Sequence, residues 1–467
     1  MTSAEGDDEY LYYQKKYDAF LTKTRMNDVP LSPKEVVEIQ TDLSGTRSDL
    51  QCCGDDNIRA LLSKIMECQE SLLSPIRKLP SDILGVIFDL VALPMQSSRL
   101  DTDLSFGIVV SLTDKIVGRV FILTWICSWW RRQALAQPTL WSSIYLVDSQ
   151  RNNDVGEEEL MKLEVLNCIL HRSGTICPMD VRLDISTRLM ITRNDTLPFL
   201  TIFSSVPFDH IQNSIIEVLT DCASRWRSFT FRTNSSTNFE AFHEVLGTKL
   251  VTLDHTSHFP FLERIDIGSD FRLNDESRAV MSVRTTFSSC HHLRLLAMHS
   301  LASTDSIELQ NLTVLEVCKY SGPSFAYLLH KCPMLQSLTV QFFIRRQDLS
   351  QDPPYLSYLS TPLRYPHLRT LKIKGMGEEF ASGAWDTIHL PSLEKVIVSF
   401  WLRMGENALD ELQEMLIRSD CPLRKVQLLW NSFHISEYST LERFIYGIPF
   451  SQECEYYINE GRYPRTH

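Results

Sequence analysis

The sequence predicts an α/β protein (α+β overall), in which a small helical module precedes an irregular solenoid of short parallel strands and helices. Two observations predict this class. Apolar residues recur at helical spacing between residues 32 and 136, and a strand-like pattern recurs between about 175 and 450. With 467 residues, the chain is long enough for one small domain followed by one long array.

The N-terminal part predicts a tail followed by helices. Residues 1–31 are polar and acidic, so we expect a flexible tail there. Residues 32–73 predict an amphipathic helical segment, which opens with Ser32, Pro33 and Glu35 in the arrangement of an N-cap, a first-turn proline and a capping box. Gly54 and its polar neighbours interrupt the pattern, which indicates a helical hairpin or a broken helix. The apolar face of this segment has two alternative roles, packing against the rest of the chain or self-association, and the sequence does not decide between them.

Residues 74–147 predict a separate compact module. Leu84 and Phe88 form an i,i+4 apolar pair on a helix that follows Pro80. We expect a loop over residues 94–114. After it, the apolar and aromatic stretch 116–136 predicts two helices at an angle, and alternation after Pro138 predicts a strand.

Residues 148–450 predict a platform made from one repeated pattern: apolar, two residues, apolar, one residue, apolar. The last two apolar residues alternate, so they form the buried side of a short strand. Helical pieces such as 325–329 and 409–417 lie between these strands, and a strand plus a helix every 20–30 residues is typical of a leucine-rich-repeat solenoid. The alternative to a solenoid is an unrelated α/β domain with several buried strands. The repeated pattern starts at Leu262, Leu293, Leu312, Leu335, Leu368, Leu393 and Leu423. After the platform, residues 451–467 predict a C-terminal tail.

Composition and charge narrow the range of partners and compartments. The net charge is −12, which argues against nucleic acid and anionic membranes because both attract clustered positive charge. The most apolar stretch, residues 116–130, contains Arg119 and is shorter than the roughly 20 residues that span a bilayer. The 12 cysteines include no CxxC pair, and the N-terminus is acidic, so we expect a cytoplasmic or nuclear protein with free thiols.

A search for catalytic or metal-binding motifs finds none with adequate spacing. The sequence contains no GxSxG, P-loop or HExxH motif. Cys290, His291 and His292 are consecutive, and neighbours on one strand point to opposite faces, so we expect no metal site there. We therefore expect no catalytic residues, no metal and no cofactor. An enzyme whose site is assembled from distant residues is the alternative.

A set of residues at fixed spacing runs through the module at 74–147: Ser74, Pro75, Ile76, Leu79, Pro80, Asp82, Ile83, Leu84, Ile87, Phe88, Leu123, Ile126, Cys127, Trp130, Arg131, Ala134, Pro138, Leu140, Trp141, Ser142 and Ile144. On these residues, 75–147 resembles the F-box, and more closely the F-box-like proteins abundant in mushroom-forming fungi. Segments around 170–178 and 223–229 are also similar to that group, so the resemblance covers most of residues 58–430. Two departures are the long insert at 94–120 and Ser128-Trp129 at a pair that is usually polar or basic.

The resemblance implies the substrate-recognition adaptor of a cullin–RING ubiquitin ligase of the SCF type. The F-box would bind the Skp adaptor and through it a cullin, while the repeats hold a target protein. The expected Skp contacts are Leu79, Pro80, Leu84, Phe88 and Ile126. Trp130 and Trp141 are expected in the core. A scaffold that has an F-box but no link to the ligase is an alternative.

The repeats also predict a charge gradient on the exposed side of the strands. In the predicted register, early strands expose Arg264, Asp266 and Glu316. Later strands expose four lysines, which could together bind an acidic or phosphorylated segment of a target. The alternative is that these lysines are ordinary solvated residues of exposed strands. They are Lys372, Lys374, Lys395 and Lys425.

Overall fold

The computed structural model of the chain divides into two compact units. The first comprises Met1–Tyr145 and Glu164–Cys177, and the second comprises Leu146–Leu163 and Pro178–His467. The boundary predicted near residue 147 therefore needs one correction, because residues 164–177 come after it in the sequence but belong to the first unit. The structure describes residues 4–25, 31–92, 108–111, 116–148, 157–185, 210–233, 259–269, 290–302, 307–321, 325–342, 363–374, 388–400 and 408–430, with Phe239, Phe242, Glu244, Phe287, Trp385 and Phe444.

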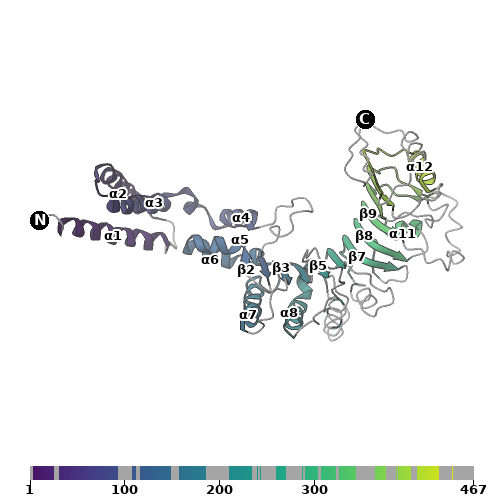
Figure 1. Cartoon of the computed structure of the whole chain (residues 1–467), viewed down its shortest axis with the longest axis horizontal. Helices are drawn as coiled ribbons and strands as arrows, with labels where there is room; N and C mark the ends of the chain where they lie inside the picture. The colour runs from purple at the N-terminus through teal and green to yellow at the C-terminus, as the bar shows by residue number, and fades with distance from the viewer. Residues whose placement is uncertain are drawn as a thin grey trace, which may run out of the picture. The chain divides into compact units, whose positions relative to one another are not determined.

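The first unit begins with α1 (Ala4–Arg25), α2 (Pro33–Cys52) and α3 (Asp56–Leu73), and α1 and α2 both pack on α3 (Figure 1). The expected flexible tail is thus wrong for residues 4–25, which form a helix. Its part-buried residues include Tyr13, Tyr17, Phe20 and Thr24, whose 4-3-4 spacing places them on one side. The tyrosines that made this segment look polar therefore supply a packing face.

The expected hairpin of 32–73 is confirmed, and both of its helices begin at side-chain caps. The Ser32 hydroxyl accepts a hydrogen bond from the Glu35 N–H at 3.3 Å, and the Glu35 carboxylate accepts one from the Ser32 N–H at 2.9 Å. The Asp55 carboxylate accepts from the Asn57 N–H at 2.7 Å and caps α3. These caps satisfy backbone donors that a helix start leaves unpaired, so the break near Gly54 is encoded locally.

One buried residue of α3 is polar, and it gives a stability prediction. Gln69 is fully buried, and neither of its amide atoms has a hydrogen-bond partner among the described residues. Because a buried unpaired amide costs about 1–3 kcal/mol, we expect Gln69→Leu to raise the free energy of unfolding by about 1 kcal/mol or more. Urea denaturation measures this change, with Gln69→Glu expected to destabilise. A lower midpoint for Gln69→Leu would contradict the expectation.

A second group of helices follows η1 (Pro75–Lys78). The two helices expected in 116–136 are present over 119–136 and are separated at Cys127, but the expectation is wrong for 116–118, which form a short strand. The loop expected at 94–114 is wrong for 108–111, where a strand forms because Ile108 and Val110 alternate into the core. It pairs antiparallel with a second short strand. The elements are α4 (Ser81–Ala92), β1 (Ile108–Ser111), β2 (Ile116–Gly118), α5 (Arg119–Ile126), α6 (Ser128–Ala136), η2 (Pro138–Trp141) and β3 (Ser143–Asp148).

The second unit contains a parallel sheet whose strands lie side by side in chain order, and only β10 and β12 are left out of that order among the described strands that follow β4 (Figure 1). Its described strands, in order, are β4 (Met179–Ile185), β5 (Trp226–Thr233), β6 (Arg264–Ser269), β7 (Leu295–Ala302), β8 (Val314–Ser321), β9 (Ser337–Phe342), β11 (Thr370–Lys374), β13 (Lys395–Phe400) and β14 (Lys425–Trp430). A separate two-stranded parallel sheet joins β10 (Leu363–Arg364) to β12 (Ile388–His389). The described helices after β3 are α7 (Glu157–Arg172), α8 (His210–Asp221), η3 (Ala223–Arg225), α11 (Phe325–Lys331) and α12 (Ala408–Ser419).

The strands repeat one local structure. In all seven predicted units the strand begins two residues after the first leucine, and the two alternating apolar residues, such as Leu371 and Ile373, are buried. The same backbone hydrogen bond also recurs just before successive strands. The Arg369 N–H donates to the Gln336 carbonyl at 2.8 Å, and the Glu394 N–H donates to the Arg369 carbonyl at 2.8 Å. The predicted helical pieces at 325–329 and 409–417 lie within α11 and α12.

These elements establish a mixed α/β protein whose sheet is mostly parallel, as the sequence predicts. Among the described residues, no helix combines the length and the apolar character needed to cross a membrane. The C-terminal tail expected at 451–467 lies outside the described residues.

Candidate functional site

Helix α4 is apolar on two opposite sides. Leu84 and Phe88 are fully buried on the inner side. Ile83, Val86 and Leu90 lie at i, i+3 and i+7 on the other side, where Val86 is 57% and Leu90 is 72% exposed. A surface helix usually carries polar residues opposite its buried stripe. The outer side of α4 is therefore an apolar surface that the described part of the chain leaves uncovered.

Helix α5 repeats this arrangement. Its inner residues Val120 and Leu123 are buried, while Ile122, Trp125 and Ile126 are exposed, with Trp125 at 78%. Large indoles are rarely left so open, because burying such a ring is worth several kcal/mol. We call Ile83, Val86, Leu90, Ile122, Trp125 and Ile126 together the exposed apolar surface.

Specific contacts hold α4 against α5, α6 and η2. The Arg119 guanidinium donates to the Val91 carbonyl at 3.2 Å, which brings the start of α5 to the end of α4. The Gln137 amide donates to the Gly85 carbonyl at 3.2 Å, and a Cβ at Gly85 would lie 3.3 Å from the Gln137 Oε1 atom. A larger residue at this position would force Gln137 to move, so Gly85 permits the close approach.

Aromatic packing forms the core beneath these helices. The Phe88 and Trp130 rings lie 5.0 Å apart, and the Phe121 and Trp141 rings meet edge to face at 5.9 Å. The Trp141 indole N–H donates to the Ala134 carbonyl at 2.8 Å. Trp130 and Trp141 are both buried, as expected from the sequence.

The expected Skp contacts divide into exposed and buried residues. Pro80 and Ile126 are exposed and Leu79 is half-buried, so their side chains are accessible. Leu84 and Phe88 are both 0% exposed, and the expectation that they contact a partner is corrected to a core role. Val86, Leu90 and Trp125 are exposed functional candidates that the sequence did not predict, because both sides of α4 and α5 are apolar and helical spacing alone does not show which side is covered.

The outward side of the parallel sheet is the second candidate surface. Strand register confirms that Lys372, Lys374, Lys395 and Lys425 occupy positions between or beside the buried ones, with Lys395 directly beside Lys425 on neighbouring strands. The Lys374 ammonium pairs with the Glu316 carboxylate at 3.3 Å across β9. Lys374 is thus neutralised within the chain, which the sequence did not predict.

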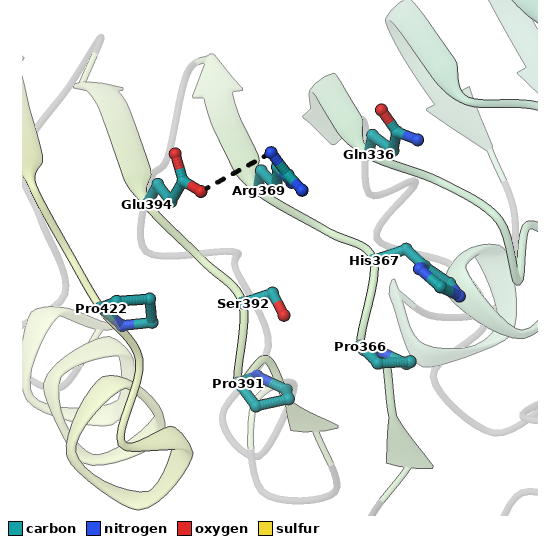
Figure 2. Close-up of a pocket in the computed structure, with 8 residues that line it drawn as sticks. All are labelled: Gln336, Pro366, His367, Arg369, Pro391, Ser392, Glu394 and Pro422. Carbon is teal, nitrogen blue, oxygen red and sulfur yellow. Dashed lines mark ion pairs between the residues drawn. The ribbon is translucent and has the colours of Figure 1, made fainter.

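A shallow hollow of about 200 Å³ lies where β9, β11, β13 and β14 begin (Figure 2). Arg369 and Glu394 meet across it, with their charged groups 3.9 Å apart. Figure 2 shows Pro366, Pro391 and Pro422 on the segments that precede β11, β13 and β14, because these three repeats each have a proline one or two residues before the leucine. The lining residues are Gln336, Pro366, His367, Arg369, Pro391, Ser392, Glu394 and Pro422.

Three cysteines of the second unit, the buried Cys290 and Cys332 and the half-buried Cys421, are poor nucleophiles. Burial raises the pKa of Cys290 and Cys332 to about 12, and burial raises the pKa of Cys421 to about 11. At neutral pH these thiols are protonated, and the thiolate is the reactive form. Within the described ranges, no three His, Cys, Asp or Glu side chains gather in a way that could hold a metal ion.

The fold and these surfaces define a mixed α/β protein whose prominent exposed features are an apolar helical surface and a charged strand face. Neither the family models compared with the sequence nor the curated proteins searched give a match.

Proposed function

We propose that the protein is the substrate-recognition adaptor of a cullin–RING (SCF-type) ubiquitin ligase, with α4–α6 docking to the Skp adaptor and the parallel sheet holding a target. The exposed apolar surface is the observation that carries this proposal. The reaction itself then belongs to other subunits, and the adaptor needs no catalytic residue, metal or cofactor. Such a complex works in the cytoplasm or nucleus.

The sequence resemblance and the packing of α4–α6 support the same assignment. Leu84, Phe88 and Trp141 are among the residues that carry the resemblance, and all three lie in the core of the helical group. Residues that carry the resemblance therefore include ones that stabilise the fold of this group. What that core presents outward is apolar on two neighbouring helices. Apolar helical faces of this kind lie against a partner's groove or helices in many complexes.

The second unit supports the platform half of the proposal. The strand starts at the same place in seven units and these strands share a backbone hydrogen-bond ladder, and both features support a leucine-rich-repeat-like array. Such arrays present long outward faces that bind proteins. A platform attached to an apolar docking module has the two parts that an adaptor requires.

We expect the double variant Leu90→Ala, Trp125→Ala to lose about 30- to 800-fold in affinity for the Skp adaptor, because each truncation of an interface anchor costs about 1–2 kcal/mol and two of them cost about 2–4 kcal/mol. Titration calorimetry with purified Skp adaptor measures this loss. Both side chains are exposed, so the free protein should keep its melting temperature. The pair Leu79→Ala, Pro80→Ala should weaken capture in the same direction.

The matched control is Val37→Ala, which truncates an exposed apolar residue of α2. It should bind the Skp adaptor as the unmodified chain does. Full affinity in a folded Leu90→Ala, Trp125→Ala protein would overturn the docking assignment. If the unmodified chain fails to bind the Skp adaptor but captures a target, a scaffold without a ligase link is the correct function.

A further inference from the structure

Helix α1 carries two large apolar residues on the side that faces away from α2 and α3. Its inner side is marked by two tyrosines. The Tyr13 hydroxyl donates to the Asp49 carboxylate of α2 at 3.3 Å, and a lysine ammonium of α3 lies over the Tyr17 ring, 5.9 Å from its centre. Leu11 and Tyr12 lie on the opposite side of α1, where they are 53% and 61% exposed. They form an apolar patch that the described part of the chain leaves uncovered.

This patch lies between two charged residues of opposite sign. Asp8 comes three residues before Leu11, and Lys15 comes three residues after Tyr12, so the four residues follow the i, i+3, i+4, i+7 spacing of one helix side. Asp8 and Lys15 are both exposed, and neither forms an ion pair with another described residue. We call Asp8, Leu11, Tyr12 and Lys15 the outer stripe.

The outer stripe is complementary to a reversed copy of itself. If two α1 helices lie antiparallel with Leu11 against Tyr12 of the second copy, Asp8 comes opposite Lys15 of the second copy at both ends. A shift of one heptad in either direction would instead place Asp8 against Asp8 or Lys15 against Lys15. A closed twofold interface uses the same patch on both copies in this reciprocal way.

The distribution of charge along the whole of α1 favours the same antiparallel arrangement. Residues 4–14 carry four acidic and no basic side chains, and residues 15–25 carry four basic and one acidic side chain. The helix dipole accounts for acid near the first turn and base near the last turn. It does not account for exposed Leu11 and Tyr12 between them, which stabilise nothing in the isolated chain.

We propose that the protein forms a weak homodimer in which the outer stripe of α1 pairs with the outer stripe of a second copy. Each copy contributes two apolar side chains, a contact smaller than the roughly 800 Å² per partner of a standard interface, so the association is reversible and of micromolar strength or weaker. A dimer presents two copies of the helical group and of the parallel sheet, which raises the avidity for a partner with two binding sites. The inference is independent of Skp docking, because α1 lies outside α4–α6.

The test is sedimentation velocity on the full chain over a series of concentrations. The unmodified chain should shift from monomer to dimer as its concentration rises. Asp8→Lys and Lys15→Glu should each weaken self-association by about tenfold or more, because each places like charges at both ends of the contact. An equimolar mixture of these two variants should recover the dimer, since every end contact then joins opposite charges.

The apolar centre and the specificity of the charge effect are tested separately. Leu11→Ala with Tyr12→Ala should abolish measurable dimerisation, because it removes the apolar part of the contact from both copies. The matched controls are Asp42→Lys and Lys34→Glu, which make the same charge changes at exposed positions of α2 and should dimerise as the unmodified chain does. All of these variants should keep the melting temperature of the monomer, since the substituted side chains are exposed.

Four outcomes would contradict the proposal. They are a chain that stays monomeric at every concentration, a dimer that survives the changes in α1, an equal loss of dimer in the α2 controls, and a mixture of Asp8→Lys with Lys15→Glu that fails to associate. Affinity for the Skp adaptor should be normal in all of these variants, so failure here and failure of the docking proposal are distinguishable.

Discussion

Replacing Phe88 with alanine should lower the free energy of unfolding of the first unit by about 3–5 kcal/mol. Phe88 is fully buried, and its ring lies 5.0 Å from that of Trp130. Truncation removes a large apolar side chain and leaves a cavity, since the surrounding helices can collapse only partly. Urea denaturation followed by tryptophan fluorescence measures the change, because Trp130 and Trp141 lie in the affected core.

Val86→Ala on the same helix is the matched control for Phe88. Val86 is exposed, so we expect a change of less than about 0.5 kcal/mol in stability. The pair separates the two sides of α4: Phe88 stabilises the fold, while Val86 is available to a partner. A small effect at Phe88 together with a large one at Val86 would mean that the helix faces the opposite way.

In the second unit, Leu338→Ala should cost about 2–5 kcal/mol of unfolding free energy. Leu338 is fully buried on β9, in register between Leu315 of β8 and Leu371 of β11. The same substitution at either of these neighbours should have a similar effect, because all three residues occupy one layer of the core. Chemical denaturation of each purified variant gives the comparison.

The outward residue Gln341 provides the control on the same strand, and Gln341→Ala should change stability by less than about 0.5 kcal/mol. In a strand, a shift of one residue exchanges the buried and outward sides completely. Losses confined to the outward position would therefore show that the register is wrong by one residue.

Local patterns explain why the strands of the second unit could be predicted from sequence. Their start positions follow the leucine pattern in every predicted unit, and the helices at 325–331 and 408–419 follow apolar spacing. Each repeat carries its own signal of alternation, so an error in one does not affect the next. The cap at Ser32 was predictable for the same reason, since a capping box involves residues only three positions apart.

The remaining features depended on residues that are distant in sequence. The helix at 4–25 looked like a tail because its charge and tyrosines dominate its composition, and its order comes from packing on α3. The ion pair between Glu316 and Lys374 joins two strands that have a third strand between them. The two residues are so far apart in the sequence that no local pattern predicts the pair. Both features require the tertiary structure to bring partners together.

The sequence alone determined the fold class, the positions of the repeated strands and the outward placement of the four lysines, because periodicity of two or 3.6 residues specifies which residues share a side. Only the tertiary structure decided which side of α4 and α5 is covered. Both sides of these helices are apolar, so hydrophobic pattern cannot distinguish them. Leu84 and Phe88 are buried because α6 and η2 pack against only one side of α4, through contacts such as that between Gln137 and Gly85. Leu90 of α4 and Trp125 of α5 lie on sides that these contacts leave exposed.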